Sequence, residues 1–205
     1  MSDATDDRRS TGLPAIDRAL GGGVPPGTLV AVVGGAGVPT EPVLYAAATP
    51  RPTRYLTTLR PPDEVEAALA RHGADATVGR VSGDELLADH SHLEGLAGST
   101  VVVDPVTDAE RGGREEYRDL LAAAKRALRA GGGVGVLHCA ETTPPTLRRD
   151  LTLARADHVW RVDLLADDRV EVRLTVTKAR GTALPDRPFA LDVAADGVTA
   201  SPVGE

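Results

Sequence analysis

The chain alternates short apolar runs with polar or amphipathic stretches. Three of the runs are rich in valine, leucine and alanine without a two-residue polar alternation, as is typical of strands buried on both faces of a parallel sheet. Two shorter runs predict further strands beside them. The predicted central strands cover residues 28–33, 54–59, 78–81, 100–104 and 134–139.

The stretches between these runs carry helix signals. The clearest is 115–130, which places Leu120, Leu121 and Leu128 on one side and is followed by a glycine run that begins at Gly131. The predicted helix at 61–72 begins with proline and acidic residues, which are favoured at helix N-termini, and it is followed by a glycine that ends it. The shorter predicted helices lie near residues 10–20, 41–48, 61–72, 84–96 and 146–154.

The last quarter of the chain predicts antiparallel strands. Residues 158–165 and 170–178 form a predicted hairpin that turns at Asp167-Asp168, and a last strand is expected near 189–193. The whole order predicts an α/β fold with a mostly parallel central sheet and antiparallel additions. Its 205 residues, without a repeat or a linker, predict one domain over residues 11–205 behind a flexible tail at 1–10.

Composition narrows the function classes. Aromatic residues make up only 2%, so the core must be aliphatic, and a stacking surface for single-stranded nucleic acid is not expected. The net charge of −7 also disfavours direct nucleic-acid binding, which depends on basic side chains at phosphates. Lys125 and Lys178 are the only lysines. An acidic, lysine-poor chain suits a saline cytoplasm, where the Debye length falls to about 3 Å at molar salt, although a GC-rich genome explains the same bias.

Cysteine usage and the N-terminus bear on location. Cys139 is the sole cysteine, so no internal disulfide and no thiolate metal cage is expected. Residues 1–10 are polar and acidic, and no apolar run approaches the ~20 residues that span a bilayer. We therefore expect a cytoplasmic protein.

A glycine-rich loop follows the first buried strand, where a phosphate-binding loop would lie. Its sequence is Gly34-Gly35-Ala36-Gly37-Val38-Pro39-Thr40-Glu41. A working phosphate loop ends in lysine and then serine or threonine, with lysine at the phosphates and the hydroxyl at Mg²⁺. Here Thr40 takes the lysine position, Glu41 takes the hydroxyl position, and Pro39 removes one backbone donor.

These substitutions are unfavourable for triphosphate. A charge-assisted hydrogen bond contributes about 1.5–3 kcal/mol, and at least one is lost with the lysine. The Glu41 carboxylate stands where phosphate should lie, and two like charges ~4 Å apart repel by about 4 kcal/mol at an effective dielectric near 20. A carboxylate at this helix N-terminus also satisfies the helix dipole itself. The loop alone is a common type of strand–helix turn, so a purely structural role stays open.

Other segments resemble the RecA superfamily, and most closely its KaiC-type branch of archaea and bacteria. The resemblance is specific in the lead-in to the loop, residues 11–28, and in the terminal segment Lys178-Ala179-Arg180-Gly181-Thr182, and it is weak between Ala74 and Gly98. Residues 101–104 are similar to the Walker B strand, which would make Asp104 the acid that organises Mg²⁺. The resemblance implies a RecA-like three-layer sandwich and, with the lysine-poor composition, a haloarchaeal source.

The departures from that family imply lost catalysis. Its paired catalytic glutamates fall on Leu59 and Arg60, so the base that would activate water is missing, and Pro105 follows Asp104 where serine is common. No ATP or Mg²⁺ cofactor is therefore expected. In KaiC-type rings the residues that match Lys178 and Arg180 reach nucleotide on the adjacent subunit. The resemblance thus implies a possible finger in trans, against the alternative of two surface charges before a turn.

Three other groups of residues are candidates for chemistry. His90 and His92 lack an evident third ligand, so solvated histidines are expected rather than a metal site. His138 and Cys139 lie at a strand end, where α/β sheets place function, but a buried cysteine is usually a small hydrophobe. A basic group on a predicted helix, in a chain that is acidic overall, indicates a solvated face rather than a binding patch; it comprises Arg148, Arg149 and Arg155.

The function hypotheses follow from these observations. The first is a KaiC/RecA-like pseudo-ATPase that acts as a regulatory or partner subunit, in a homo-oligomer or in a heteromer with an intact paralogue. The second is an ATP-binding protein whose degenerate site still works. The third is an accessory factor in DNA recombination or repair, which the acidic, aromatic-poor composition disfavours.

Overall fold

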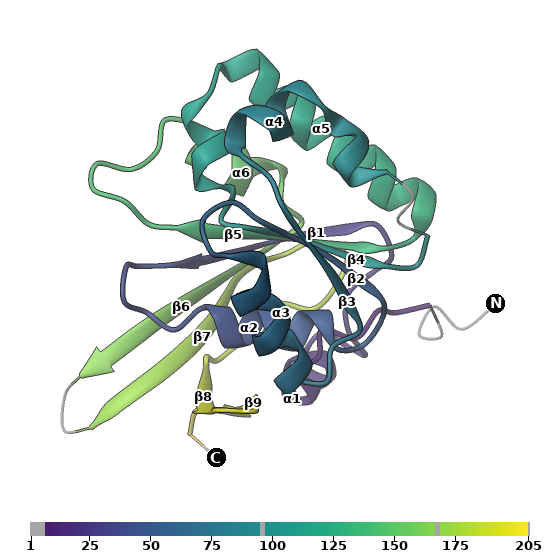
Figure 1. The fold of residues 1–205 in the computed structure, drawn as a ribbon. Helices are drawn as coiled ribbons and strands as arrows, with labels where there is room; N and C mark the ends of the chain where they lie inside the picture. Colours follow the sequence, from purple (N-terminus) through teal and green to yellow (C-terminus); the bar gives the residue numbers. More distant parts are fainter. Residues whose placement is uncertain (1–6, 95–96, 167–168, 205) are drawn as a thin grey trace.

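The computed structural model describes residues 7–94, 97–166 and 169–204 (Figure 1). Within these residues one sheet has the strand order β3-β2-β4-β5-β1-β6-β7-β8-β9. Strands β3 to β6 of that order run parallel, and β6 to β9 pair antiparallel. The strands are β1 (Thr28–Gly34), β2 (Thr53–Thr57), β3 (Ala76–Arg80), β4 (Thr100–Asp104), β5 (Val134–Ala140), β6 (His158–Ala166), β7 (Val170–Ala179), β8 (Phe189–Ala194) and β9 (Gly197–Pro202).

Helices cover both faces of the sheet, which makes three layers (Figure 1). One face carries α1 (Pro14–Ala19), α2 (Glu41–Ala48) and α3 (Pro62–Arg71). The other carries α4 (Gly83–Ala88), α5 (Arg114–Gly131) and α6 (Arg149–Arg155), with the 3-10 turns η1 (His90–Leu93) and η2 (Val106–Arg111) in the connections. The predicted fold, a mostly parallel sheet with C-terminal antiparallel strands, is confirmed. Among the described residues no helix is both long and apolar enough to cross a membrane.

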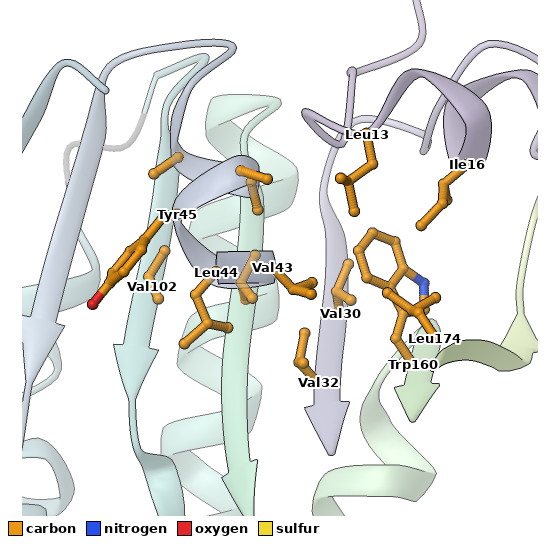
Figure 2. Packing of buried hydrophobic residues seen from close by; sticks show 14 of the residues in the cluster. Leu13, Ile16, Val30, Val32, Val43, Leu44, Tyr45, Val102, Trp160 and Leu174 are labelled. Atoms are coloured by element: carbon orange, nitrogen blue, oxygen red, sulfur yellow. The ribbon is translucent and has the colours of Figure 1, made fainter. Parts of the chain in front are cut away.

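An aliphatic core fills each space between helices and sheet. On the α1–α3 face, Leu13 and Ile16 point toward the Trp160 indole, and Leu174 of β7 lies against the same ring (Figure 2). On the α5 face, leucines of α5 such as Leu121 pack against valines of the central strands. Both faces of β1 are buried along its whole length, which explains its uninterrupted apolar run.

Several element boundaries differ from the sequence prediction. The helix expected over 84–96 is interrupted, and its described part forms two separate pieces, α4 and η1. The break occurs because the Asp89 backbone is extended and its side chain accepts a hydrogen bond from the Ser91 amide, which begins the new turn. Residues 95–96 of that prediction lie outside the described residues. The strand β9 was not predicted, although Asp196-Gly197 is a strong hairpin-turn signal. The predicted turn at Asp167-Asp168 lies outside the described residues.

The predicted N-terminal tail is mostly outside the described residues, which begin at residue 7. Its last part is attached to the domain. Arg9 forms an antiparallel bridge with Val24, and its guanidinium donates to the Gly132 carbonyl at 3.1 Å. Residues 7–10 of the predicted tail therefore pack with the domain.

Candidate functional site

The candidate site lies at the carboxyl edge of the parallel strands, where β4, β5 and β1 are neighbours. Gly34 ends β1 and begins the glycine loop, Asp104 ends β4, and His138 lies two residues before the end of β5. Parallel strands bring their carboxyl ends to the same edge of a sheet. The glycine loop and the Walker B-like acid, far apart in sequence, are therefore brought together.

A chain of buried hydrogen bonds, here called the relay, joins four side chains at this edge. Thr40 Oγ1 lies 2.9 Å from His138 Nε2, and His138 Nδ1 lies 2.5 Å from Asp104 Oδ1. The Tyr55 hydroxyl donates to Asp104 Oδ2 at 2.5 Å. All four residues are buried, and Thr40 is only 2% exposed. The residue at the lysine position is thus connected to the Walker B-like acid through one imidazole, that of His138.

The carboxylate fixes one step of the relay. A carboxylate only accepts, so His138 donates from Nδ1 to Asp104, while Nε2 and the Thr40 hydroxyl share the second hydrogen bond. Burial, together with the neighbouring Asp104, raises the pKa of the Tyr55 phenol well above its usual range. Tyr55 therefore stays protonated and donates to the second carboxylate oxygen. Both oxygens of Asp104 are engaged by side chains of the protein.

Two backbone amides of the glycine loop donate within the loop itself. The Val38 amide donates to the Gly35 carbonyl at 3.1 Å, and the Thr40 amide donates to the Val38 carbonyl at 2.9 Å. Pro39 has no amide hydrogen. An anion-binding loop needs amides that converge on the ligand, so three of the positions that would face phosphate offer it no donor.

Thr40 also fills space beneath the loop. A Cβ added at Gly34 would lie only 2.3 Å from Thr40 Cγ2, so this methyl group packs directly on the Gly34 backbone. Real Cβ atoms essentially never show so short a contact. Glycine is therefore required at position 34 by the Thr40 side chain rather than by a positive φ angle.

Charged groups surround the loop. Glu41 is the first residue of α2 and is half-buried. Glu141 and Arg161 form an ion pair of 2.9 Å whose side chains are 40% and 43% exposed. At the end of β2, Arg60 donates to the Tyr45 hydroxyl, while Leu59 is 69% exposed.

The order hydroxyl, imidazole, carboxylate in the relay is also that of the catalytic triads of hydrolases. A nucleophile must have room for a reacting carbon about 3 Å away. Thr40 is 2% exposed, its methyl group is held by Gly34, and its hydroxyl points to buried His138. The relay therefore connects structural elements rather than presenting a nucleophile.

Lys178 and Arg180 lie at the opposite edge of the sheet. The end of β7 pairs with the start of β6, next to the amino ends of the parallel strands. Lys178 Nζ donates to the Leu153 carbonyl at 2.6 Å and to Ala154 at 3.1 Å, and Arg180 donates to Ala154 at 3.2 Å. Within the chain the two basic residues thus bind the free carbonyls at the C-terminal end of α6.

The remaining sequence candidates are separated from one another. His90 and His92 lie in η1, and among the described residues no group of three or more His, Cys, Asp or Glu side chains is placed to hold a metal. Cys139 is fully buried, and burial raises the pKa of its thiol. The expected solvated helix face does not include Arg149, which is largely buried.

Arg149 belongs to a buried network that the sequence did not reveal. Its guanidinium binds both carboxylate oxygens of Glu110, at 2.8–3.0 Å, and Glu110 is 0% exposed. The hydroxyls of Thr146 and Thr152 each donate to the same carboxylate at 2.5 Å. The network attaches α6 to η2 and to the end of β5, and no spacing pattern in the sequence connects these residues.

The lead-in segment that resembles KaiC-type proteins has a structural role here. Asp17 accepts from the Ser10 hydroxyl at 2.6 Å and from the Thr11 amide at 2.8 Å. Gly12 has φ +79°, and an added Cβ would lie 1.8 Å from the Ala46 carbonyl oxygen of α2. The segment therefore packs its backbone tightly against the helix that follows the glycine loop.

The sheet order, with a glycine loop after β1 and an acid at the end of β4, is that of a RecA-like fold. The chain belongs to a family described as "Family of unknown function (DUF7125)", whose model matches residues 8–200.

A solved structure supports the fold. The chain is similar to the KaiC-like protein PH0186 from the hyperthermophilic archaeon Pyrococcus horikoshii OT3, with a TM-score of 0.76 and 18% sequence identity. The match covers 95% of this chain and 99% of that one. At this identity the likeness shows the KaiC-like RecA fold and nothing about activity. No curated protein matches the sequence.

Proposed function

We propose that the protein is a non-hydrolysing KaiC/RecA-like pseudo-ATPase that works as a regulatory or partner subunit through protein–protein contact. The relay carries the proposal. Thr40 stands where lysine would meet phosphate, and it is bonded through His138 to Asp104, the acid that would help hold Mg²⁺. The groups that would bind the ligand are bonded to one another.

The surroundings of the relay also fit Mg·ATP poorly. The loop amides of Val38 and Thr40 donate within the loop, and Glu41 places a carboxylate at the start of α2. A like charge about 4 Å from phosphate costs about 4 kcal/mol at an effective dielectric near 20. Leu59 and Arg60 replace the glutamates of the KaiC-type pattern, so the base that this pattern supplies for water is missing from these two positions. We therefore expect neither ATP nor Mg²⁺ as a cofactor.

Calorimetric titration with Mg·ATP and Mg·ADP tests this proposal directly. We expect no saturable heat up to millimolar nucleotide and no phosphate release. An intact KaiC-type ATPase in the same buffer is the positive control. Micromolar binding would refute the proposal and favour the alternative, an ATP-binding protein with a degenerate but working site.

The proposed partner is an intact KaiC-type paralogue. Arg180 is exposed and makes one bond to an α6 carbonyl, so its guanidinium keeps donors for a second contact. If it acts in trans, an Arg180→Ala variant should fail to raise the paralogue's hydrolysis rate where the wild type does. Arg187→Ala, an exposed arginine on the connection before β8, is the matched control. Equal rates with wild type and Arg180→Ala would remove the finger from the proposal.

We also propose that the protein works in a saline cytoplasm. The net charge of −7 and the two lysines support this. Screening lowers the repulsion between crowded carboxylates, so the free energy of unfolding should rise between about 0.1 M and about 2 M KCl. Stability that is flat or falls over this range would favour the compositional explanation, a GC-rich genome.

A further inference from the structure

Residues 8–10, here called the strap, cross the edge of the sheet where the parallel strands begin. At one end the Arg9 guanidinium donates to the Gly132 carbonyl at 3.1 Å, just before β5. At the other end the Arg8 guanidinium donates to the Gly181 carbonyl at 2.9 Å, just after β7. β1 and β6 lie between β5 and β7 in the sheet. The side chains of the strap therefore reach across the amino ends of β1 and β6.

The strap is attached by polar contacts. Arg9 and Val24 exchange two backbone hydrogen bonds, of 2.8 and 2.9 Å. The Ser10 carbonyl accepts from Arg51 at 2.8 Å, and the Ser10 hydroxyl donates to Asp17 at 2.6 Å. A segment held by such contacts opens locally at a lower free energy than the whole domain unfolds. The strap can therefore leave the sheet without loss of the core.

His158 is the first residue of β6 and lies at the same edge of the sheet. It pairs with Val30 of β1 on one side and with Ala179 of β7 on the other, and it is 0% exposed. Among the described residues neither of its ring nitrogens has a hydrogen-bond partner, although buried polar groups in proteins nearly always have one. A fully buried imidazole without a hydrogen bond thus begins the strand that the Arg8 side chain crosses.

The surroundings of His158 favour the neutral ring. Burial lowers the pKa of His158, and the Arg8 guanidinium lowers it further. Asp157 and the Arg180 backbone act in the opposite direction, but the Asp157 carboxylate is paired with Lys125. While the strap is closed, a proton on this ring would place a buried charge near the guanidinium of Arg8.

We propose that the strap and His158 form a pH-sensitive switch, in which protonation of the imidazole releases residues 8–10 from the sheet while the domain stays folded. In the open form the ring meets water, which stabilises its charge. The imidazolium and the Arg8 guanidinium are both cations, so their repulsion also favours opening. Release breaks the bond from Arg8 to Gly181, so the turn after β7 loses a contact as well.

The sign and size of the pH dependence follow from proton linkage. The open ring binds a proton below about pH 6.5, the ordinary pKa of histidine, whereas the closed ring keeps a lower pKa. Between these two pKa values the ratio of open to closed strap should rise up to about tenfold for each unit by which the pH falls. Above about pH 7.5 the ring is neutral in both forms, so the ratio should not change with pH.

Hydrogen exchange of the Arg9 and Val24 amides, followed by NMR from about pH 7.5 to about pH 5, measures this ratio. Each rate is divided by that of an unstructured chain at the same pH, because intrinsic exchange also depends on pH. In wild type the protection of both amides should fall up to about tenfold for each unit below about pH 6.5. In His158→Leu the protection should not change with pH. His92→Gln, in η1, which packs against α5, is the control and should behave like wild type.

Three results would overturn the proposal. One is protection of the strap amides that does not change with pH in wild type, and another is an equal fall in His158→Leu. The third is exchange as slow as that of the Leu121 amide in α5, which reports unfolding of the whole domain, because the strap would then not open by itself. The switch involves neither the glycine loop nor a partner, so this test and nucleotide titration address different claims.

Discussion

Replacing Thr40 by valine tests whether the relay is part of the framework of the fold. Valine keeps a methyl group for the contact with Gly34 and removes only the hydroxyl. The variant leaves His138 Nε2 without its partner at 2.9 Å, in a site where the histidine is 8% exposed. A buried donor or acceptor left without a partner costs about 1–3 kcal/mol. We therefore expect the free energy of unfolding to fall by that amount.

The assay is thermal and urea unfolding of the apo protein. For a domain of this size 1 kcal/mol corresponds to about 2–4 °C, so the Tm should fall by about 2–12 °C. Thr199→Val, at an exposed position of β9, is the control and should change the Tm little. An unchanged or raised Tm for Thr40→Val would refute the argument, because groups kept for ligand binding, rather than for folding, are often replaced without loss of stability.

Three further predictions concern stability. Glu110→Gln should lower the free energy of unfolding, measured by urea titration, by about 3–5 kcal/mol, because it leaves the buried Arg149 guanidinium without its carboxylate. The control Asp108→Asn, at an exposed ion pair, should change the free energy of unfolding by less than about 1 kcal/mol in the same titration. Gly34→Ala should lower the free energy of unfolding by about 1–3 kcal/mol, because the added Cβ meets Thr40 Cγ2. Adding Thr40→Ser, which removes that methyl group, should restore part of this stability in the double variant. A double variant no more stable than Gly34→Ala would contradict the contact. Burial lowers the pKa of His158, so the folded state keeps this imidazole neutral while the unfolded chain takes up a proton below about pH 6.5. His158 therefore favours unfolding increasingly as pH falls below that value, and the slope of stability against pH between 7.5 and 5 should be shallower in His158→Leu.

Local sequence was enough for the elements whose signals do not depend on distant contacts. The run at 28–33 predicts a buried strand, and β1 is buried along its full length. The amphipathic stretch at 115–130 predicts α5, since its leucines repeat at helical spacing. The ends of helices were harder to predict where a single side chain sets them. Asp89, whose side chain begins η1, divides the helix predicted over 84–96 in this way.

Only part of the candidate site could be predicted from the sequence. The loop and Asp104 follow from strand–loop–helix order and from the acid that ends a buried strand. That Thr40 bonds to His138, and His138 to Asp104, depends on β5 lying between β1 and β4, which no local pattern specifies. Glu110 and Arg149 were missed for the same reason, because hydrogen-bond partners 39 residues apart meet only in the folded chain.

The sequence by itself determined most of the segments that become strands and helices, though not β9, and it showed that residues 39–41 depart from a phosphate-binding loop. Apolar periodicity and side-chain charge are local properties, and they survive without knowledge of the fold. Only the tertiary structure decided what replaced the lost chemistry: a buried relay, and two loop amides, those of Val38 and Thr40, that donate within the loop. The relay depends on the order of strands in the sheet, which is set by packing between distant segments.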